Sequence, residues 1–125
     1  MSKYGQVAIQ ATKASRKGTN PVDAWKQSVR SVFPTQKSSR EKGCPKCAFL
    51  GLAEAGLIKG VVPPGSYTRS KDNKQYALDA VHRLKKSPNL ASAPAKLWDL
   101  ISRDDKQHNG QLDVVIGLWN NNDLK

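Results

Sequence analysis

The sequence predicts an all-α protein, a compact bundle of about six helices, and three observations support this. Apolar residues recur every three or four positions through most of the chain, which is the spacing of one helix face. Asparagine or proline precedes several of these stretches and glycine or proline follows them, as at helix ends. No internal repeat or linker divides the 125 residues, so we expect a single globular domain over residues 1–125.

The first two helices are predicted over residues 3–17 and 21–33. The first stretch carries Tyr, Val and Ala at helical spacing. The second has the stronger signals, because Asn20 can cap its start, Pro21 suits its first turn and Pro34 stops it.

Residues 34–44 predict a basic polar loop, since almost every side chain in it is polar or charged. Within the loop, Ser38 and Glu41 have capping-box spacing, which allows one helical turn. A proline then opens a third helix, predicted over residues 45–56, with a glycine at its end.

The chain after residue 58 carries signals of a short two-stranded hairpin, a possible wing on the bundle. Residues 59–62 are predicted to be extended, and Pro63-Pro64-Gly65 is a turn sequence. Residues 67–69 would then form the returning arm.

Three further helices are predicted towards the end of the chain. They cover residues 73–86, residues 94–103 and a stretch from Asn109 to about residue 119, and a polar link at 104–108 separates the last two. The three tryptophans lie on apolar helix faces, so we expect them in the core; they are Trp25, Trp98 and Trp119.

The charge is strongly positive and unevenly spread. The chain has 21 Lys and Arg against 10 Asp and Glu, a net charge of +11. Residues 1–50 carry +8, residues 51–100 carry +4 and residues 101–125 carry −1. Such a field attracts polyanions, above all nucleic acid. The alternative is that the charge only keeps the protein soluble.

Several classes of protein are excluded or disfavoured by simple counts. No apolar run approaches the length of a membrane span, and the first residues lack the apolar stretch of a signal peptide. Two cysteines are too few for a disulfide-stapled scaffold. We therefore expect a soluble, cytoplasmic protein with no membrane partner.

Two basic runs are the candidate binding residues. In each, cations alternate with hydroxyl side chains just before a predicted helix, where phosphate can meet charge, hydroxyl donors and backbone N–H groups. Tyr67 is the best candidate for stacking on a base. The loop before the third helix is too long for a tight helix-turn-helix, so base-specific contacts are not predicted. The candidate residues are Lys37, Ser38, Ser39, Arg40, Lys42, Lys46, Tyr67, Arg69, Lys71 and Lys74.

Other chemical motifs are weaker. Cys44 and Cys47 stand at a helix start, where thiolates are favoured, but the βαβ context of a dithiol redox domain is missing. The two histidines, His82 and His108, lack the paired spacing of a zinc site. His108 next to Asp104 and Asp105 has no accompanying nucleophile. We expect no catalytic residue, metal or cofactor.

Several motifs together resemble a family of small bacterial proteins of unknown function. The most specific is the segment from Ser38 to Pro45, with Lys37 before it; the others are Phe49-Leu50-Gly51-Leu52, Gly56-Leu57-Ile58-Lys59-Gly60 and Tyr67-Thr68-Arg69-Ser70, with Gln111-Leu112-Asp113-Val114-Val115 near the end. The resemblance covers nearly the whole chain. It implies a soluble bacterial or phage-related protein and supplies no activity or catalytic residue.

The leading functional hypothesis is a non-enzymatic, basic nucleic-acid-binding or regulatory module that contacts DNA or RNA phosphates through the two basic loops. The alternative is a protein-interaction module that binds an acidic partner through the same face. An enzyme that depends on a thiol or a histidine is the least favoured hypothesis, and Cys44, Asp105 and His108 are the residues that would test it.

Overall fold

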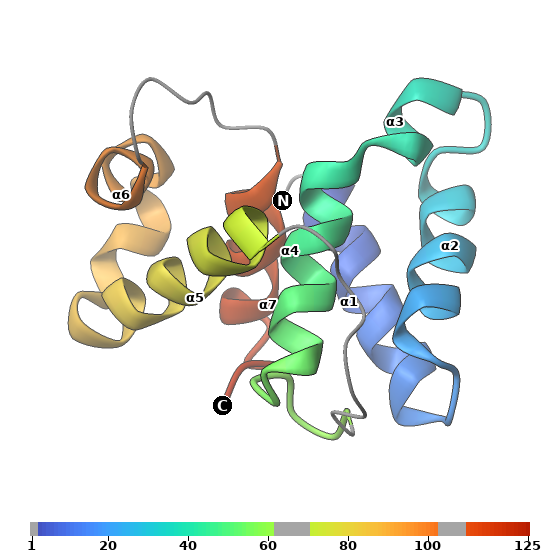
Figure 1. Ribbon diagram of the computed structural model, residues 1–125, viewed down its shortest axis with the longest axis horizontal. Coiled ribbons are helices and arrows are strands. Elements are labelled where there is room, and N and C mark those ends of the chain that lie inside the picture. Colours follow the sequence, from blue (N-terminus) through green and yellow to red (C-terminus); the bar gives the residue numbers. More distant parts are fainter. Residues whose placement is uncertain (1–2, 62–70, 103–109) are drawn as a thin grey trace.

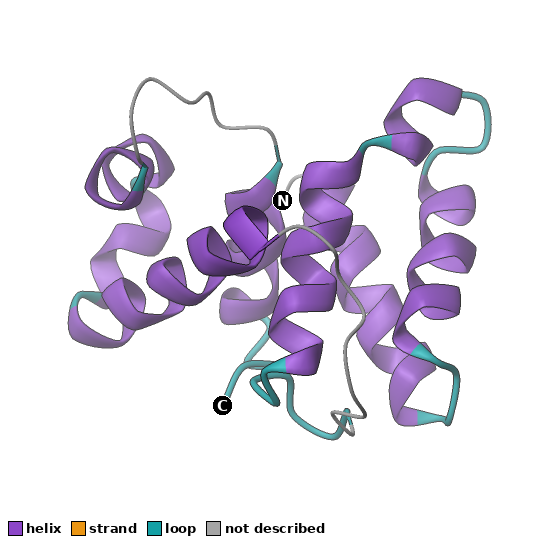
Figure 2. Cartoon of the chain, viewed as in Figure 1, coloured by secondary structure: helices purple, strands orange, loops and turns teal. Residues whose placement is uncertain are grey.

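The computed structural model describes residues 3–61, 71–102 and 110–125, and it confirms the predicted all-α bundle (Figures 1 and 2). Six of its helices have at least eight residues and correspond to the six predicted ones. The elements are α1 (Lys3–Arg16), α2 (Pro21–Val32), α3 (Lys37–Glu41), α4 (Gly43–Glu54), α5 (Lys71–Lys86), the 3-10 helix η1 (Pro88–Ser92), α6 (Pro94–Ile101) and α7 (Gln111–Asn120).

The start of α2 follows the sequence signals closely. The Asn20 side chain accepts a hydrogen bond of 2.9 Å from the backbone N–H of Val22, and Pro21 occupies the first turn. An N-cap acceptor of this kind satisfies one of the backbone donors that a helix start leaves without a partner.

Replacing Asn20 by alanine should therefore destabilise the protein by about 1 kcal/mol. Urea unfolding followed by circular dichroism measures the change. Asn20→Ser keeps a capping oxygen and should stay within a few tenths of a kcal/mol of the wild-type protein. Equal losses in the two variants would contradict a capping role.

The core is built around α4, which packs against α5 and α7 in the centre of the molecule (Figure 1). Phe49 on α4 is fully buried, and its ring stacks on Trp25 of α2 at a centroid distance of 5.3 Å. Trp25 and Trp98 are buried as predicted, whereas Trp119 is half-buried and packs against the core from its edge.

Two glycines allow helices to cross at very short range. A Cβ atom on Gly51 would lie 2.7 Å from the Cβ of Lys74 and 2.9 Å from its Cα, so α4 and α5 touch there. A Cβ on Gly117 would lie 2.7 Å from the Cα of Gly5, so α7 rests on the backbone of α1. The sequence analysis did not predict either contact.

The segment after residue 58 pairs with the C-terminal residues. Ile58 and Leu124 form an isolated antiparallel bridge, and the N–H of Lys125 donates to the carbonyl of Leu57 at 2.8 Å. The turn and the returning arm of the predicted hairpin, residues 62–70, lie outside the described residues.

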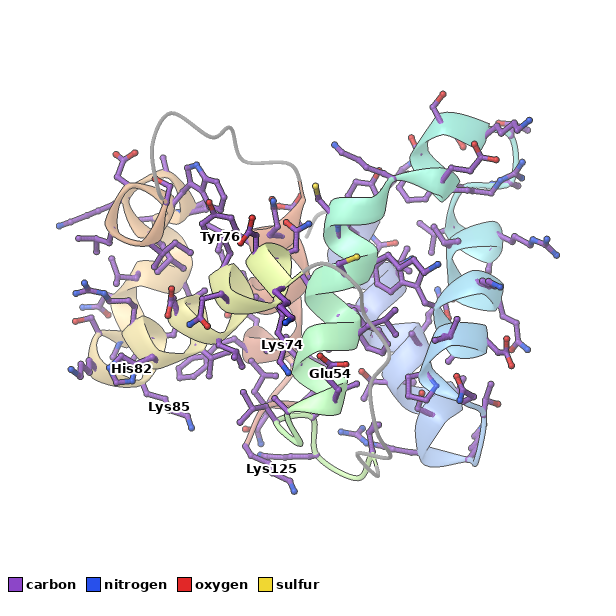
Figure 3. All side chains as sticks on the ribbon, in the orientation of Figure 1. Glu54, Lys74, Tyr76, His82, Lys85 and Lys125 are labelled. Carbon is purple, nitrogen blue, oxygen red and sulfur yellow. The ribbon has the colours of Figure 1, made fainter. Side chains whose placement is uncertain are left out.

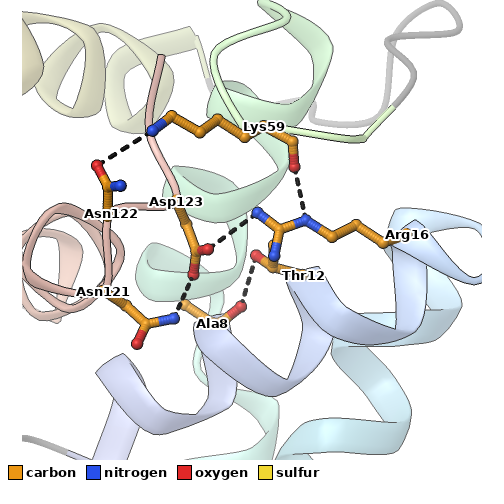
Figure 4. Close-up of polar contacts among 7 residues, drawn as sticks. All are labelled: Ala8, Thr12, Arg16, Lys59, Asn121, Asn122 and Asp123. Atoms are coloured by element: carbon orange, nitrogen blue, oxygen red, sulfur yellow. Dashed lines mark hydrogen bonds and ion pairs between the residues drawn. The ribbon is translucent and has the colours of Figure 1, made fainter.

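Arg16 at the end of α1 ties these segments together (Figure 4). Its Nη2 donates to Oδ1 of the buried Asp123 at 2.9 Å, and its Nε donates to the carbonyl of Lys59 at 2.7 Å. The Asn121 amide donates to the second carboxylate oxygen of Asp123 at 2.8 Å. One guanidinium thus joins the chain at residues 16, 59 and 123; we call this group the Arg16 clasp.

Candidate nucleic-acid interface

The most specific part of the first basic run forms the short helix α3, which joins the end of α2 to the start of α4 (Figure 1). The sequence predicted a polar loop that allows one helical turn here, and the structure has that turn. None of the five residues of α3 is buried, and Gln36 before it makes no side-chain capping bond. The basic side chains of this segment therefore lie at the surface.

A cavity of about 580 Å³ lies between α2, α3 and the first turns of α4. We call it the cationic groove, because four of its seven lining side chains are cations and one is a carboxylate. The lining residues are Trp25, Lys26, Val29, Arg30, Arg40, Glu41 and Lys46.

The cations of the groove are not neutralised by the protein. Among the described residues, the two ion pairs join Arg16 to Asp123 and Lys74 to Glu54, and neither involves the groove. Arg40 donates from Nη1 to the carbonyl of Pro34 at 3.0 Å, which uses one of its five N–H donors and none of its charge. The groove therefore presents uncompensated positive charge and many unused hydrogen-bond donors.

The sequence analysis named only part of this groove. It selected Arg40 and Lys46 but missed Lys26 and Arg30, which lie one helical turn apart on the exposed face of α2. Their four-residue spacing placed them on one face. Because exposed cations on a helix are common, only the packing of α2 beside α3 gives them a shared target.

The remaining residues of the first run point in different directions. The Lys42 ammonium lies 5.7 Å from the centre of the Tyr4 ring on α1, and the Tyr4 hydroxyl donates to the carbonyl of Ser39 at 3.2 Å. Burial raises the pKa of Tyr4 above its usual value, with a smaller raising effect from Asp113. Lys37 and Ser38 are exposed. These residues flank the groove and do not line it.

The second basic run contributes less charge than its sequence suggests. Lys71 is exposed at the start of α5, but the Lys74 ammonium lies 2.9 Å from the Glu54 carboxylate, where Figure 3 shows the two side chains between α4 and α5. The Glu54 side chain is only 8% exposed, so Lys74 is engaged by a buried carboxylate. Tyr67 and Arg69 lie outside the described residues.

The comparison with protein families gave one match. The model of a family of unknown function, DUF6979, covers residues 1–125. The chain belongs to this family. The resemblance that the motifs predicted is thereby confirmed at the level of a family of unknown function. Comparisons with curated proteins and with solved structures gave no match. Membership in DUF6979 assigns no activity to any residue, so the function has to be argued from the site itself.

The other chemistry considered for this DUF6979 chain is thinly represented in the described structure. Cys44 and Cys47 are reduced and half-buried in the first turns of α4, and His82 is exposed on α5. Within residues 3–61, 71–102 and 110–125, no three His, Cys, Asp or Glu side chains are placed to hold a metal ion. Residues 104–108, with the candidate histidine and acids, lie outside the described residues.

The helices of this DUF6979 chain were also compared with what a lipid bilayer demands. Within the described ranges, no helix combines the length and the apolarity that crossing a bilayer needs.

Proposed function

We propose that the chain is a non-enzymatic nucleic-acid-binding or regulatory module whose phosphate contacts lie in and beside the cationic groove. The observation that carries this proposal is the set of four unpaired cations, Lys26, Arg30, Arg40 and Lys46, around one concave surface with a single carboxylate among them. Lys and Arg that face solvent without acidic partners bind phosphates by charge and by N–H donation.

The flanking residues extend the contact beyond the groove. Lys37 and Ser38 are exposed on α3 and are free to meet neighbouring phosphates, with Ser39 and Lys42 beside them. Lys71 would add a contact from the start of α5, together with Tyr67 and Arg69 of the second run. Because Lys74 is paired with Glu54, we assign it the smallest share of the binding energy.

The salt dependence of binding tests the proposal. Labelled duplex and single-stranded DNA and RNA are titrated by fluorescence anisotropy at several salt concentrations. The logarithm of the binding constant should fall linearly with the logarithm of the salt concentration, by about 0.9 per duplex phosphate neutralised, or about 0.7 for a single strand.

A matched pair of double variants locates the interface. The Arg30→Gln/Arg40→Gln variant removes two charges from the groove and should lower the slope by roughly two phosphate contacts. The Lys85→Gln/Lys86→Gln variant also removes two charges, but from the exposed end of α5, away from α3 (Figure 3), and should leave the slope nearly unchanged.

Three outcomes would count against the proposal. The first is the absence of binding to any of the four nucleic acids at low salt. The second is an equal loss of slope in both double variants, which would mean diffuse attraction by net charge. The third is the capture of an acidic protein through the groove without nucleic-acid binding, which would favour the interaction-module alternative.

A further inference from the structure

The wall of the cationic groove contains a buried hydrogen-bond donor that has no acceptor. The Trp25 side chain is 1% exposed, and its indole N–H makes no hydrogen bond to any described residue. Unpaired buried donors are rare in folded proteins, and each one calls for a partner that the chain itself does not supply. Since an indole nitrogen can only donate, that partner must be an acceptor.

The other polar groups of the groove ask for the same kind of ligand. Lys26, Arg30, Arg40 and Lys46 carry donors and no acceptor, and Glu41 is the only acceptor among the lining side chains. A ligand that matches this set needs several acceptor oxygens and more than one negative charge in a small volume. A phosphate group has those properties.

We propose that the cationic groove binds the phosphomonoester group of a nucleotide, at the end of a nucleic-acid strand or on a free nucleotide. A phosphodiester within a strand carries one negative charge, whereas a terminal phosphomonoester carries about 1.5 to 2 at neutral pH. Four cations facing one carboxylate match the monoester better. This inference deepens the proposed function and rests on it for the identity of the ligand.

The shape of the groove favours a strand end over the middle of a duplex. Its walls come from three helices, α2, α3 and α4, and its volume of about 580 Å³ lies within the usual range of pockets for small ligands, about 300–1,000 Å³. A continuous duplex can lie across such a hollow but cannot enter it. Because the indole nitrogen exposes less than 1 Å² of surface, a neighbouring side chain must shift before a phosphate oxygen reaches it.

Single-stranded DNA of one sequence with different ends tests the inference. The oligonucleotides carry a 5′-phosphate, a 3′-phosphate or no terminal phosphate, and a fourth lacks the terminal phosphate but is one nucleotide longer, which controls for added charge. We expect at least one phosphorylated strand to bind about tenfold more tightly than the unphosphorylated one, a difference of about 1.4 kcal/mol. The longer control should gain no more than a small fraction of that.

Two variants assign the preference to the groove. Trp25→Phe keeps an aromatic ring against Phe49 and removes only the N–H, so it should reduce the preference for a terminal phosphate several-fold. Arg30→Gln, on the exposed face of α2, should reduce it further without involving the core. Lys85→Gln, on α5, should preserve it. Thermal unfolding of each variant confirms that the fold is intact.

A titration with a nucleoside monophosphate separates the two sources of the phosphate. Competition at a concentration near that of the phosphorylated strand supports a free nucleotide as ligand, and much weaker competition supports a strand end. If all four oligonucleotides bind equally with a steep salt dependence, the further inference is wrong and the proposed function stands. If no oligonucleotide binds, the proposed function fails, and a nucleoside monophosphate that also leaves the thermal midpoint unchanged overturns the inference as well.

Discussion

Replacing Gly117 by alanine is expected to destabilise the protein by about 2 kcal/mol. The added Cβ would lie 2.7 Å from the Cα of Gly5 and 3.2 Å from its carbonyl oxygen, so α1 and α7 must move apart. Overpacking of this kind costs about 1–3 kcal/mol or more, and because the obstacle is backbone no side chain can turn away. The gain in helix propensity from glycine to alanine, about 1 kcal/mol, offsets only part of the cost.

Gly43→Ala provides the matched control for this prediction. Gly43 lies in the first turn of α4, and a Cβ there meets nothing within 4 Å. The same chemical change should therefore be neutral or slightly stabilising. Urea unfolding of both variants measures the difference, with an expected fall in the midpoint of about 1 M for Gly117→Ala. Similar midpoints for the two variants would show that the crossing of α1 and α7 is not closely packed.

Replacing Asp123 by alanine is expected to cost a similar amount, because it removes the carboxylate of the Arg16 clasp. The Asp123 side chain is 5% exposed and accepts hydrogen bonds from Arg16 and from Asn121. A hydrogen bond to a charged group contributes about 1.5–3 kcal/mol. Since the Arg16 side chain is 35% exposed and water screens part of the attraction, we expect a total loss of about 2 kcal/mol.

Asp99→Ala is the control for the clasp. Asp99 is exposed on α6 and makes no ion pair with the described residues, so its loss should change the free energy of unfolding by less than about 0.5 kcal/mol. Asp123→Asn keeps an acceptor for the guanidinium and should fall between the two. An Asp123→Ala variant as stable as Asp99→Ala would mean that the clasp closes without contributing to stability.

The helices were predictable because their signals are local. Asn20 and Pro21 start α2 by satisfying or removing backbone donors within one turn, and nothing distant is needed for that. The pairing of Ile58 with Leu124 was not predictable, because it joins residues far apart in sequence. The close approach at Gly51 and Gly117 was missed for the same reason, since a glycine inside a helix gives no sign of which partner it meets.

The candidate site was predicted in part. The spacing of cations and hydroxyl groups around α3 correctly indicated a basic surface segment, and Arg40 and Lys46 do share one cavity. The sequence could not show that Lys26 and Arg30 complete that cavity, which depends on how α2 packs beside α3. It also could not show that Lys74 is engaged by Glu54, because that ion pair forms only where α4 and α5 cross.

The construction of α3 has a consequence for how any ligand enters. This single turn buries none of its residues, so unwinding it would leave the core around Phe49 untouched. Segments of this kind open at a small fraction of the free energy needed to unfold the whole protein. One wall of the binding hollow can therefore melt and reform on its own, letting a guest that is too large for the closed shape be admitted and then enclosed.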